Sequence, residues 1–148
     1  MTTPDGAPSS SRSRARVLLI DDEPGNLLTF RRVFSSLYDI TLASSAKEAL
    51  MRLDAATGDQ AFDVVLLDFA MPEMNGAHFL ESMRKKHATL PCLFLTAYAE
   101  LEEVKKVSGR YLVAAVIAKP WEKHDVEHRI DLAVRMSRMK RSSSRLRT

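Results

Sequence analysis

The sequence predicts an α/β protein with a doubly wound, five-stranded parallel sheet, and two patterns carry that prediction. Five short apolar segments alternate with longer segments whose apolar residues recur every three or four positions, as on one face of a helix. The short segments contain few polar residues, which is typical of strands that helices cover on both faces of a sheet. At 148 residues, the chain suits a single domain of five strand–helix units.

The first two units lie in residues 17–53. Residues 17–21 form the first expected strand, and Pro24 suits the first turn of the helix that follows it. Residues 39–43 form the second expected strand, and Ser45 and Glu48 match the capping box that opens many helices. The apolar residues at helical spacing are Leu27, Phe30, Phe34 and Leu37 in the first helix, and Ala49, Leu50 and Leu53 in the second.

The last three units follow the same order. Residues 63–68, 92–96 and 112–118 form the expected strands, and a helix follows each of them. The last of these helices begins after Pro120. The apolar residues that mark the three helices are Phe79, Leu80 and Met83, then Leu101, Val104 and Val107, then Val126, Ile130 and Val134.

Charge is distributed unevenly along the chain. Residues 1–16 carry a net charge of +2 and residues 135–148 carry +6, whereas residues 17–134 carry −5. Both ends are rich in Ser and Arg and poor in apolar residues, a composition typical of disordered or frayed segments. We therefore expect a disordered N-terminal tail at 1–15, an ordered domain at 16–136 and a basic C-terminal tail at 137–148. The basic tail could stay solvated or contact a partner, a membrane surface or nucleic acid through charge.

Several features predict a cytoplasmic location. No apolar run approaches the roughly 20 residues that span a bilayer, and the polar N-terminus lacks an apolar export signal. The single cysteine, Cys92, lies in an apolar segment, which suggests a buried and unreactive thiol.

Polar residues stand at the ends of four expected strands. Asp21 and Asp22 end the first, Asp68 ends the third, Thr96 ends the fourth and Lys119 follows the fifth. Parallel strands bring these ends to one edge of the sheet, where ligands of doubly wound folds bind. Grouped carboxylates repel one another unless a cation joins them, and Mg²⁺ prefers oxygen ligands. A hydroxyl and an ammonium beside the carboxylate of Asp68 predict phosphoryl transfer to that residue, which would form an aspartyl phosphate.

These residues lie in four segments, "LLIDDEPGN", "DVVLLDFAMPEMNG", "CLFLTAYAE" and "VIAKPW". Together the segments resemble the receiver domain of two-component response regulators, and the resemblance covers about residues 16–136. It implies a flavodoxin-like fold with strand order 2-1-3-4-5. It also implies a signalling module that catalyses its own phosphorylation and dephosphorylation, either as a stand-alone receiver or as part of a longer regulator.

The resemblance implies a role for each site residue. Thr96 and Lys119 would contact the phosphoryl group on Asp68, and the Lys119–Pro120 bond would be cis. The Mg²⁺ ligands would be Asp21, Asp22, Asp68 and the backbone carbonyl of Ala70.

The resemblance also implies partners. The phosphoryl donor would be the phosphohistidine of a sensor histidine kinase or phosphotransfer protein. The phosphorylated domain would change conformation and bind a downstream effector protein, and it could form a homodimer. No helix-turn-helix segment follows the domain, so sequence-specific binding of nucleic acid is not expected.

The sequence departs from the family pattern at three positions. Val116 stands where an aromatic residue commonly takes part in the switch. Ala70 and Tyr98 stand where acidic or amide residues would orient the water that removes the phosphoryl group. We therefore expect slow self-dephosphorylation.

Other functions remain open at this stage. A receiver-like domain could signal without phosphorylation. A magnesium-dependent aspartyl phosphatase of the haloacid dehalogenase type would carry a second acid where Ala70 stands. A nucleotide or flavin binder would carry a glycine-rich loop after the first strand, where "DDEPGN" stands instead.

Overall fold

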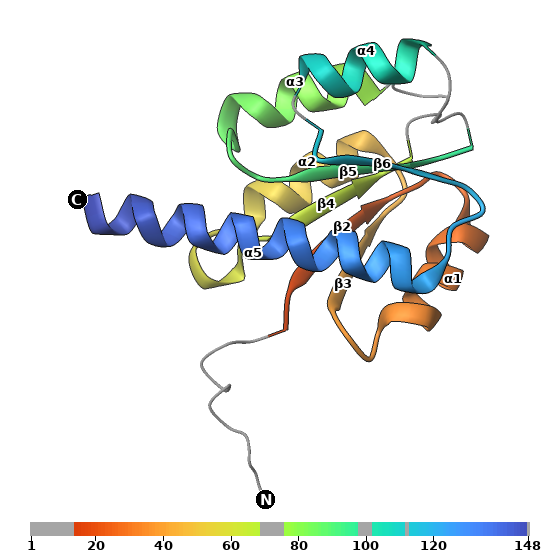
Figure 1. The fold of residues 1–148 in the computed structure, drawn as a ribbon, viewed down its shortest axis with the longest axis horizontal. Helices are drawn as coiled ribbons and strands as arrows, with labels where there is room; N and C mark the ends of the chain where they lie inside the picture. Colours follow the sequence, from red (N-terminus) through yellow and green to blue (C-terminus); the bar gives the residue numbers. More distant parts are fainter. Residues whose placement is uncertain (1–13, 69–75, 98–101, 112, 148) are drawn as a thin grey trace, which may run out of the picture.

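The protein contains the predicted five-stranded parallel sheet (Figure 1). A computed structural model describes residues 14–68, 76–97, 102–111 and 113–147. Its strands are β2 (Arg16–Ile20), β3 (Asp39–Ala43), β4 (Val64–Leu67), β5 (Cys92–Thr96) and β6 (Ala115–Ala118). They pair in the order β3-β2-β4-β5-β6, and every pair is parallel. Counted along the chain, this confirms the predicted order 2-1-3-4-5.

Five α-helices follow the strands, as predicted. They are α1 (Pro24–Phe34), α2 (Ala46–Ala55), α3 (Gly76–Lys86), α4 (Glu102–Arg110) and α5 (Lys123–Arg147), with a short 3-10 helix, η2 (Gly58–Gln60), before β4. Pro24 opens α1, and the Ser45 hydroxyl caps α2 by accepting a hydrogen bond of 3.1 Å from the Glu48 backbone N–H. Helix α1 ends at Phe34, so Leu37, expected inside it, lies in the turn that follows. Leu101, expected in α4, lies outside the described residues.

The sheet separates two apolar cores, because alternate residues of each strand point to opposite faces. One core contains Leu18, Val65 and Phe94 from the strands, and α2, α3 and α4 cover it. The other contains Leu19, Leu66 and Leu93, and α1 and α5 cover it. Both faces of the sheet are therefore buried, as the nearly continuous apolar strands predicted.

Aromatic residues join α1 to the start of α5. The Trp121 ring centroid lies 5.9 Å from that of Phe30 and 5.5 Å from that of Phe34. The Tyr38 hydroxyl donates a hydrogen bond of 2.8 Å to Asp131 Oδ1 on α5. Burial, together with this bond to a carboxylate, raises the pKa of Tyr38 far above its usual range.

The prediction of a frayed C-terminal segment is wrong. Helix α5 continues to Arg147, and Figure 1 shows its last turns projecting past the sheet. Residues 1–13 of the expected N-terminal tail lie outside the described residues. The domain boundaries at 15/16 and 136/137 stay predictions.

A buried carboxylate holds the extended part of α5 against the domain. Asp63, 3% exposed, accepts a hydrogen bond of 2.9 Å from the Arg16 backbone N–H. It also accepts hydrogen bonds from the guanidinium groups of Arg138 and Arg141, one turn apart on α5. Burial alone would raise the pKa of Asp63, but the hydrogen bonds from these three residues outweigh it and the pKa is lowered.

Candidate functional site

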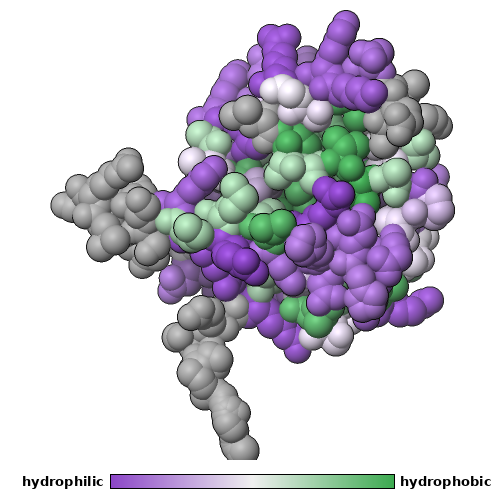
Figure 2. All heavy atoms as spheres, in the orientation of Figure 1, coloured by the Kyte–Doolittle hydropathy of each residue, from purple (hydrophilic) through white to green (hydrophobic). Residues whose placement is uncertain are grey.

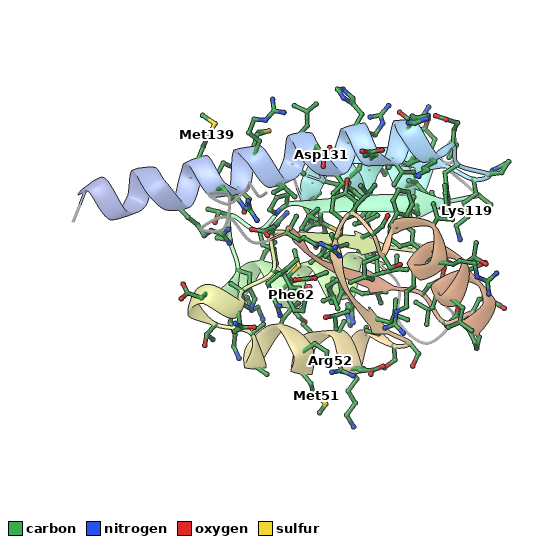
Figure 3. The ribbon with its side chains drawn as sticks, turned by 90° about the horizontal axis from the view of Figure 1, so that it is seen from below. Met51, Arg52, Phe62, Lys119, Asp131 and Met139 are labelled. Atoms are coloured by element: carbon green, nitrogen blue, oxygen red, sulfur yellow. The ribbon has the colours of Figure 1, made fainter. Side chains whose placement is uncertain are left out.

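The structure brings the predicted site residues to one edge of the sheet. Asp21 follows β2, Asp68 follows β4, Thr96 ends β5 and Lys119 follows β6. Backbone hydrogen bonds continue the strand pairing into this edge, because Asp21 N–H donates to Ala43 O and Asp68 N–H donates to Ile20 O. The strand pairing therefore fixes the backbone positions of Asp21 and Asp68. Figure 3 shows Lys119 at the end of the molecule opposite to the projecting end of α5.

Three carboxylates form a compact acidic cluster at this edge. Asp21, Asp22 and Asp68 each offer one carboxylate oxygen, and these oxygens lie within 4.8 Å of one another. Asp21 is 4% exposed, Asp22 is half-buried and the side chain of Asp68 is 13% exposed. Bare carboxylates this close repel one another, and the repulsion grows as water is removed. Ala70, expected to supply a carbonyl ligand, lies outside the described residues.

Lys119 supplies positive charge to this cluster. Its Nζ atom lies 3.5 Å from Asp21 Oδ2 and 3.5 Å from Asp68 Oδ2. One ammonium thus stands between two carboxylates that come from different strands. The lysine side chain keeps 24% of its surface exposed, so a ligand from solvent can reach the same ammonium.

Sequence reasoning gave no role to Asn26, which holds Asp21 in place. The Asn26 side-chain amide donates a hydrogen bond of 3.2 Å to Asp21 Oδ2. The backbone N–H of Glu23 donates one of 3.0 Å to Asp21 Oδ1. The signal that could have revealed this role was the position of Asn26 in the first turn of α1, three residues after Glu23.

The remaining predicted residues lie close to the cluster along the chain. Thr96 is fully buried at the end of β5, and its backbone carbonyl accepts a hydrogen bond of 3.0 Å from the Lys119 N–H. The Lys119–Pro120 peptide bond is cis, as the resemblance implied. Val116, on β6, packs against the core that α2, α3 and α4 cover. Tyr98 lies outside the described residues.

The chemistry of the cluster fits a hard divalent cation. Its ligand atoms are carboxylate oxygens, which suit Mg²⁺, and Mg²⁺ is commonly held by one or two carboxylates while it keeps several waters. Asp21, Asp22 and Asp68 are the described residues that could hold it. Lys119 could balance the charge of an anionic group bound beside them.

Comparison with known proteins identifies the family. The family model described as response regulator receiver domain matches residues 17–131. This chain is a member of that family. It is thus a receiver domain of two-component systems, which is a family of signalling modules.

Individual relatives agree with this family. The chain is 34% identical over 107 residues to the sensor protein GacS of Pseudomonas syringae, a match that covers 69% of this chain and 11% of the relative. It is 30% identical over 135 residues to the alkaline phosphatase synthesis transcriptional regulatory protein PhoP of Bacillus subtilis, covering 89% of this chain and 53% of the relative. The receiver thus spans about half or less of these two longer relatives.

Solved structures share the fold. A CheY-like response regulator receiver domain protein from Methanospirillum hungatei superposes with a TM-score of 0.76 at 25% identity, covering 86% of this chain and 99% of that one. The non-phosphorylated HemR receiver domain from Leptospira biflexa superposes with a TM-score of 0.68 at 30% identity, covering 82% of this chain and 94% of that one.

Among the helices in the described residues, none is both long enough and apolar enough to cross a membrane.

Proposed function

We propose that this receiver accepts a phosphoryl group on Asp68 in a Mg²⁺-dependent step and that the phosphorylated form binds a different partner from the free form. One observation carries the proposal. The oxygens of Asp21, Asp22 and Asp68 lie within 4.8 Å of one another, and Lys119 Nζ lies 3.5 Å from Asp68 Oδ2. A carboxylate so placed is a nucleophile with an ammonium beside it and with two further carboxylates that could hold a neutralising cation, and phosphoryl transfer requires such positioning and charge neutralisation.

Each residue has a distinct part in the proposed reaction. An Asp68 oxygen attacks phosphorus in line with the bond to the donor's imidazole nitrogen. That bond breaks, and its electron pair stays with the imidazole. Lys119 and the Thr96 hydroxyl would contact the transferred phosphoryl oxygens. Asp21 and Asp22 would hold the cation, which would supply positive charge to neutralise the phosphoryl group.

The proposed donor is the phosphohistidine of a sensor histidine kinase or phosphotransfer protein. Relatives named as sensor proteins, such as GacS and EvgS, support this donor class because a segment of each matches this chain. The effector would be a protein that binds the phosphorylated conformation more tightly than the free one. A homodimer of the phosphorylated form is one such complex.

Intact-mass analysis tests the proposal directly. The purified protein is incubated with Mg²⁺ and acetyl phosphate, beside Asp68→Asn and the control Asp59→Asn. Asp59 is exposed in η2, which precedes β4, whereas Asp68 follows the opposite end of this strand. We expect one added phosphoryl group on the wild type and on Asp59→Asn, and none on Asp68→Asn or when Mg²⁺ is chelated. An equal gain of mass in Asp68→Asn would refute the assignment of Asp68.

The same samples measure how long the phosphoryl group survives. With Ala70 and Tyr98 in place of acidic or amide residues, no side chain at either position orients an attacking water well. We expect slow loss of the phosphoryl group after the donor is removed, and faster loss in Ala70→Glu. Fast loss in the wild type, unchanged in Ala70→Glu, would contradict this explanation.

A further inference from the structure

A cavity of about 240 Å³ lies at the end of the sheet opposite to the acidic cluster. Its walls come from the C-terminal ends of α2 and α3, the segments that precede β4 and β5, and the extended part of α5. These segments meet where the strands begin, whereas Asp68 follows the end of β4. Figure 3 shows Phe62, one of the lining residues, between α5 and α2. The cavity is therefore separate from the proposed phosphorylation site.

The cavity is also separate from the apolar surface beside α4. Figure 2 shows apolar atoms between α4 and α5 on the face that it draws. Of the described residues that line the cavity, none belongs to α4 or to β6. A ligand in the cavity would therefore leave that surface uncovered.

Part of the cavity wall is apolar. Leu53, Phe62 and Leu90 line it and are themselves buried, and three alanines also line it. Such a wall favours a ligand with an apolar body, because binding removes apolar surface from water. A cavity of about 150 Å³ can hold benzene. The present cavity therefore suits a body the size of one ring or a short alkyl chain.

Basic side chains line the same cavity. They are Lys86 and Arg141, and none of the described lining residues is acidic. Lys86 Nζ lies 3.4 Å from Asp54 Oδ2, but both side chains are more than half exposed, so this ion pair is weak. Arg141 binds Asp63, which also binds Arg138. One carboxylate thus faces two guanidinium groups and does not cancel the charge of both.

Arg141 has hydrogen-bond donors to offer a ligand. A guanidinium carries five N–H donors in one plane. The Nη2 atom donates to Asp63, whereas Nη1 reaches the Phe62 carbonyl only at 3.5 Å. The side chain is 41% exposed. A ligand carboxylate could therefore accept from Nη1 while Nη2 stays bound to Asp63.

His87 adds an unsatisfied polar atom to the cavity wall. Among the buried side-chain nitrogens and oxygens of the described residues, its Nε2 is the one without a hydrogen-bond partner. Asp54 Oδ1 lies 3.9 Å away, which is beyond hydrogen-bond reach. The side chain as a whole is 26% exposed, so a small turn of the ring would bring Nε2 to a ligand oxygen. Because an unpartnered buried nitrogen is costly, such an oxygen would be favoured.

We propose that this cavity binds a small organic acid, in which one carboxylate is attached to a single ring or a short alkyl chain. The carboxylate accepts hydrogen bonds from Arg141 and His87, and the apolar body lies against the buried lining residues. A single negative charge suits the site, because Lys86 and Arg141 each already face an aspartate. Binding does not use Asp68, so this site can stand or fall separately from the proposed phosphoryl transfer.

A segment of this chain would suit the cavity less well. Residues 1–16 carry a net charge of +2, the same sign as Lys86 and Arg141, and this repulsion opposes their entry. A small acid brings the opposite charge, and it enters without the entropy cost of ordering a chain segment.

Phenylacetate serves as the probe, added to the full chain in the absence of Mg²⁺. Phenylacetamide keeps its shape but removes its charge, acetate removes its ring, and inorganic phosphate tests for a site that takes any anion. The backbone amide resonances of the isotope-labelled protein locate the site and give the affinity. We expect saturable binding with a Kd of about 1 mM or below, with shifts centred on Thr89 and Ser137 and not on Lys119. The amide, acetate and phosphate should each bind at least about tenfold more weakly.

Two substitutions test the two parts of the site. Arg141→Gln removes the guanidinium, and Ala61→Leu adds volume at a lining residue while every charged group stays in place. We expect each to weaken phenylacetate binding at least about tenfold. Arg135→Gln is the matched control, because Arg135 is exposed on α5 and does not line the cavity. Circular dichroism checks that the variants fold, and Ala61→Leu still tests the site if Arg141→Gln loosens the end of α5.

Several results would overturn the proposal. They are no saturable binding of phenylacetate, shifts centred on Thr96 and Lys119, wild-type affinity in Ala61→Leu, and an equal loss of affinity in Arg135→Gln. Equal binding of phenylacetamide would leave no role for the basic side chains. Equal binding of acetate or phosphate would leave no role for the apolar wall, and either outcome would refute a site for a small organic acid.

Discussion

Asp21 is the most tightly held carboxylate of the acidic cluster. Its Oδ2 atom lies 3.2 Å from the Asn26 amide nitrogen and 3.5 Å from Lys119 Nζ, and its Oδ1 atom accepts from the Glu23 N–H. Asn26 can turn Asp21 toward the other carboxylates without carrying charge itself. It is a positioning residue for the proposed cation site.

We predict that Asn26→Ala weakens Mg²⁺ binding about tenfold, the usual loss when a hydrogen-bonding partner of a metal ligand is removed. The shift of the melting temperature with Mg²⁺ concentration measures this affinity without requiring phosphorylation. Thr29→Ala, an exposed position on the same helix, is the control and should bind Mg²⁺ like the wild type. An unchanged Mg²⁺ affinity in Asn26→Ala would mean that Asp21 keeps its orientation without Asn26.

At the scale of elements, local pattern predicted most of the structure and missed one part. Strand hydrophobicity and helix spacing predicted each strand to within a few residues and the α-helix that follows it, because burial on the sheet decides them. The acidic cluster was also predictable, since parallel strands bring their ends together. The helical extension of α5 was not predictable from composition. Its Ser and Arg content resembles that of a disordered tail, and the contact that holds it, Asp63 with Arg138, spans 75 residues of sequence.

We predict that Asp63→Asn lowers the free energy of unfolding by about 2 kcal/mol at neutral pH. The substitution removes the charge from hydrogen bonds that are worth more than neutral ones. Because the pKa of Asp63 is lowered in the folded protein, its contribution is complete above the unfolded-state pKa of about 3.9. The contribution is lost as pH falls through the folded-state value.

Urea unfolding at several pH values measures this contribution. The difference between wild type and Asp63→Asn should be constant from about pH 7 to about pH 5 and shrink toward about pH 3. Asp59→Asn, exposed in η2, should show almost no difference at any pH. A difference between wild type and Asp63→Asn that did not change with pH would show that the loss comes from packing and not from charge.

At the scale of the whole molecule, β4 connects the contact that holds α5 with the acidic cluster, because these two features lie at opposite ends of this strand. Asp63 immediately precedes this strand and holds α5, and Asp68 immediately follows it and lies in the acidic cluster. All four residues of the strand are buried. Its neighbour β5 begins at Cys92, the single cysteine of the chain, which is fully buried as predicted.

Cys92 can therefore report on opening of the whole sheet. Burial raises the pKa of its thiol to about 12, although the charge of Arg84 partly opposes this. At about pH 8 the folded protein should hold almost no thiolate, so a thiol reagent should label Cys92 only when the sheet opens. We predict that the free energy of opening calculated from the labelling rate equals the free energy of unfolding measured with urea. Asp63→Asn should then be labelled about 30-fold faster, the factor that corresponds to about 2 kcal/mol. Labelling could instead be faster than global unfolding allows and equal in the wild type and Asp63→Asn. That result would mean that β5 opens locally, without release of α5 from residue 63.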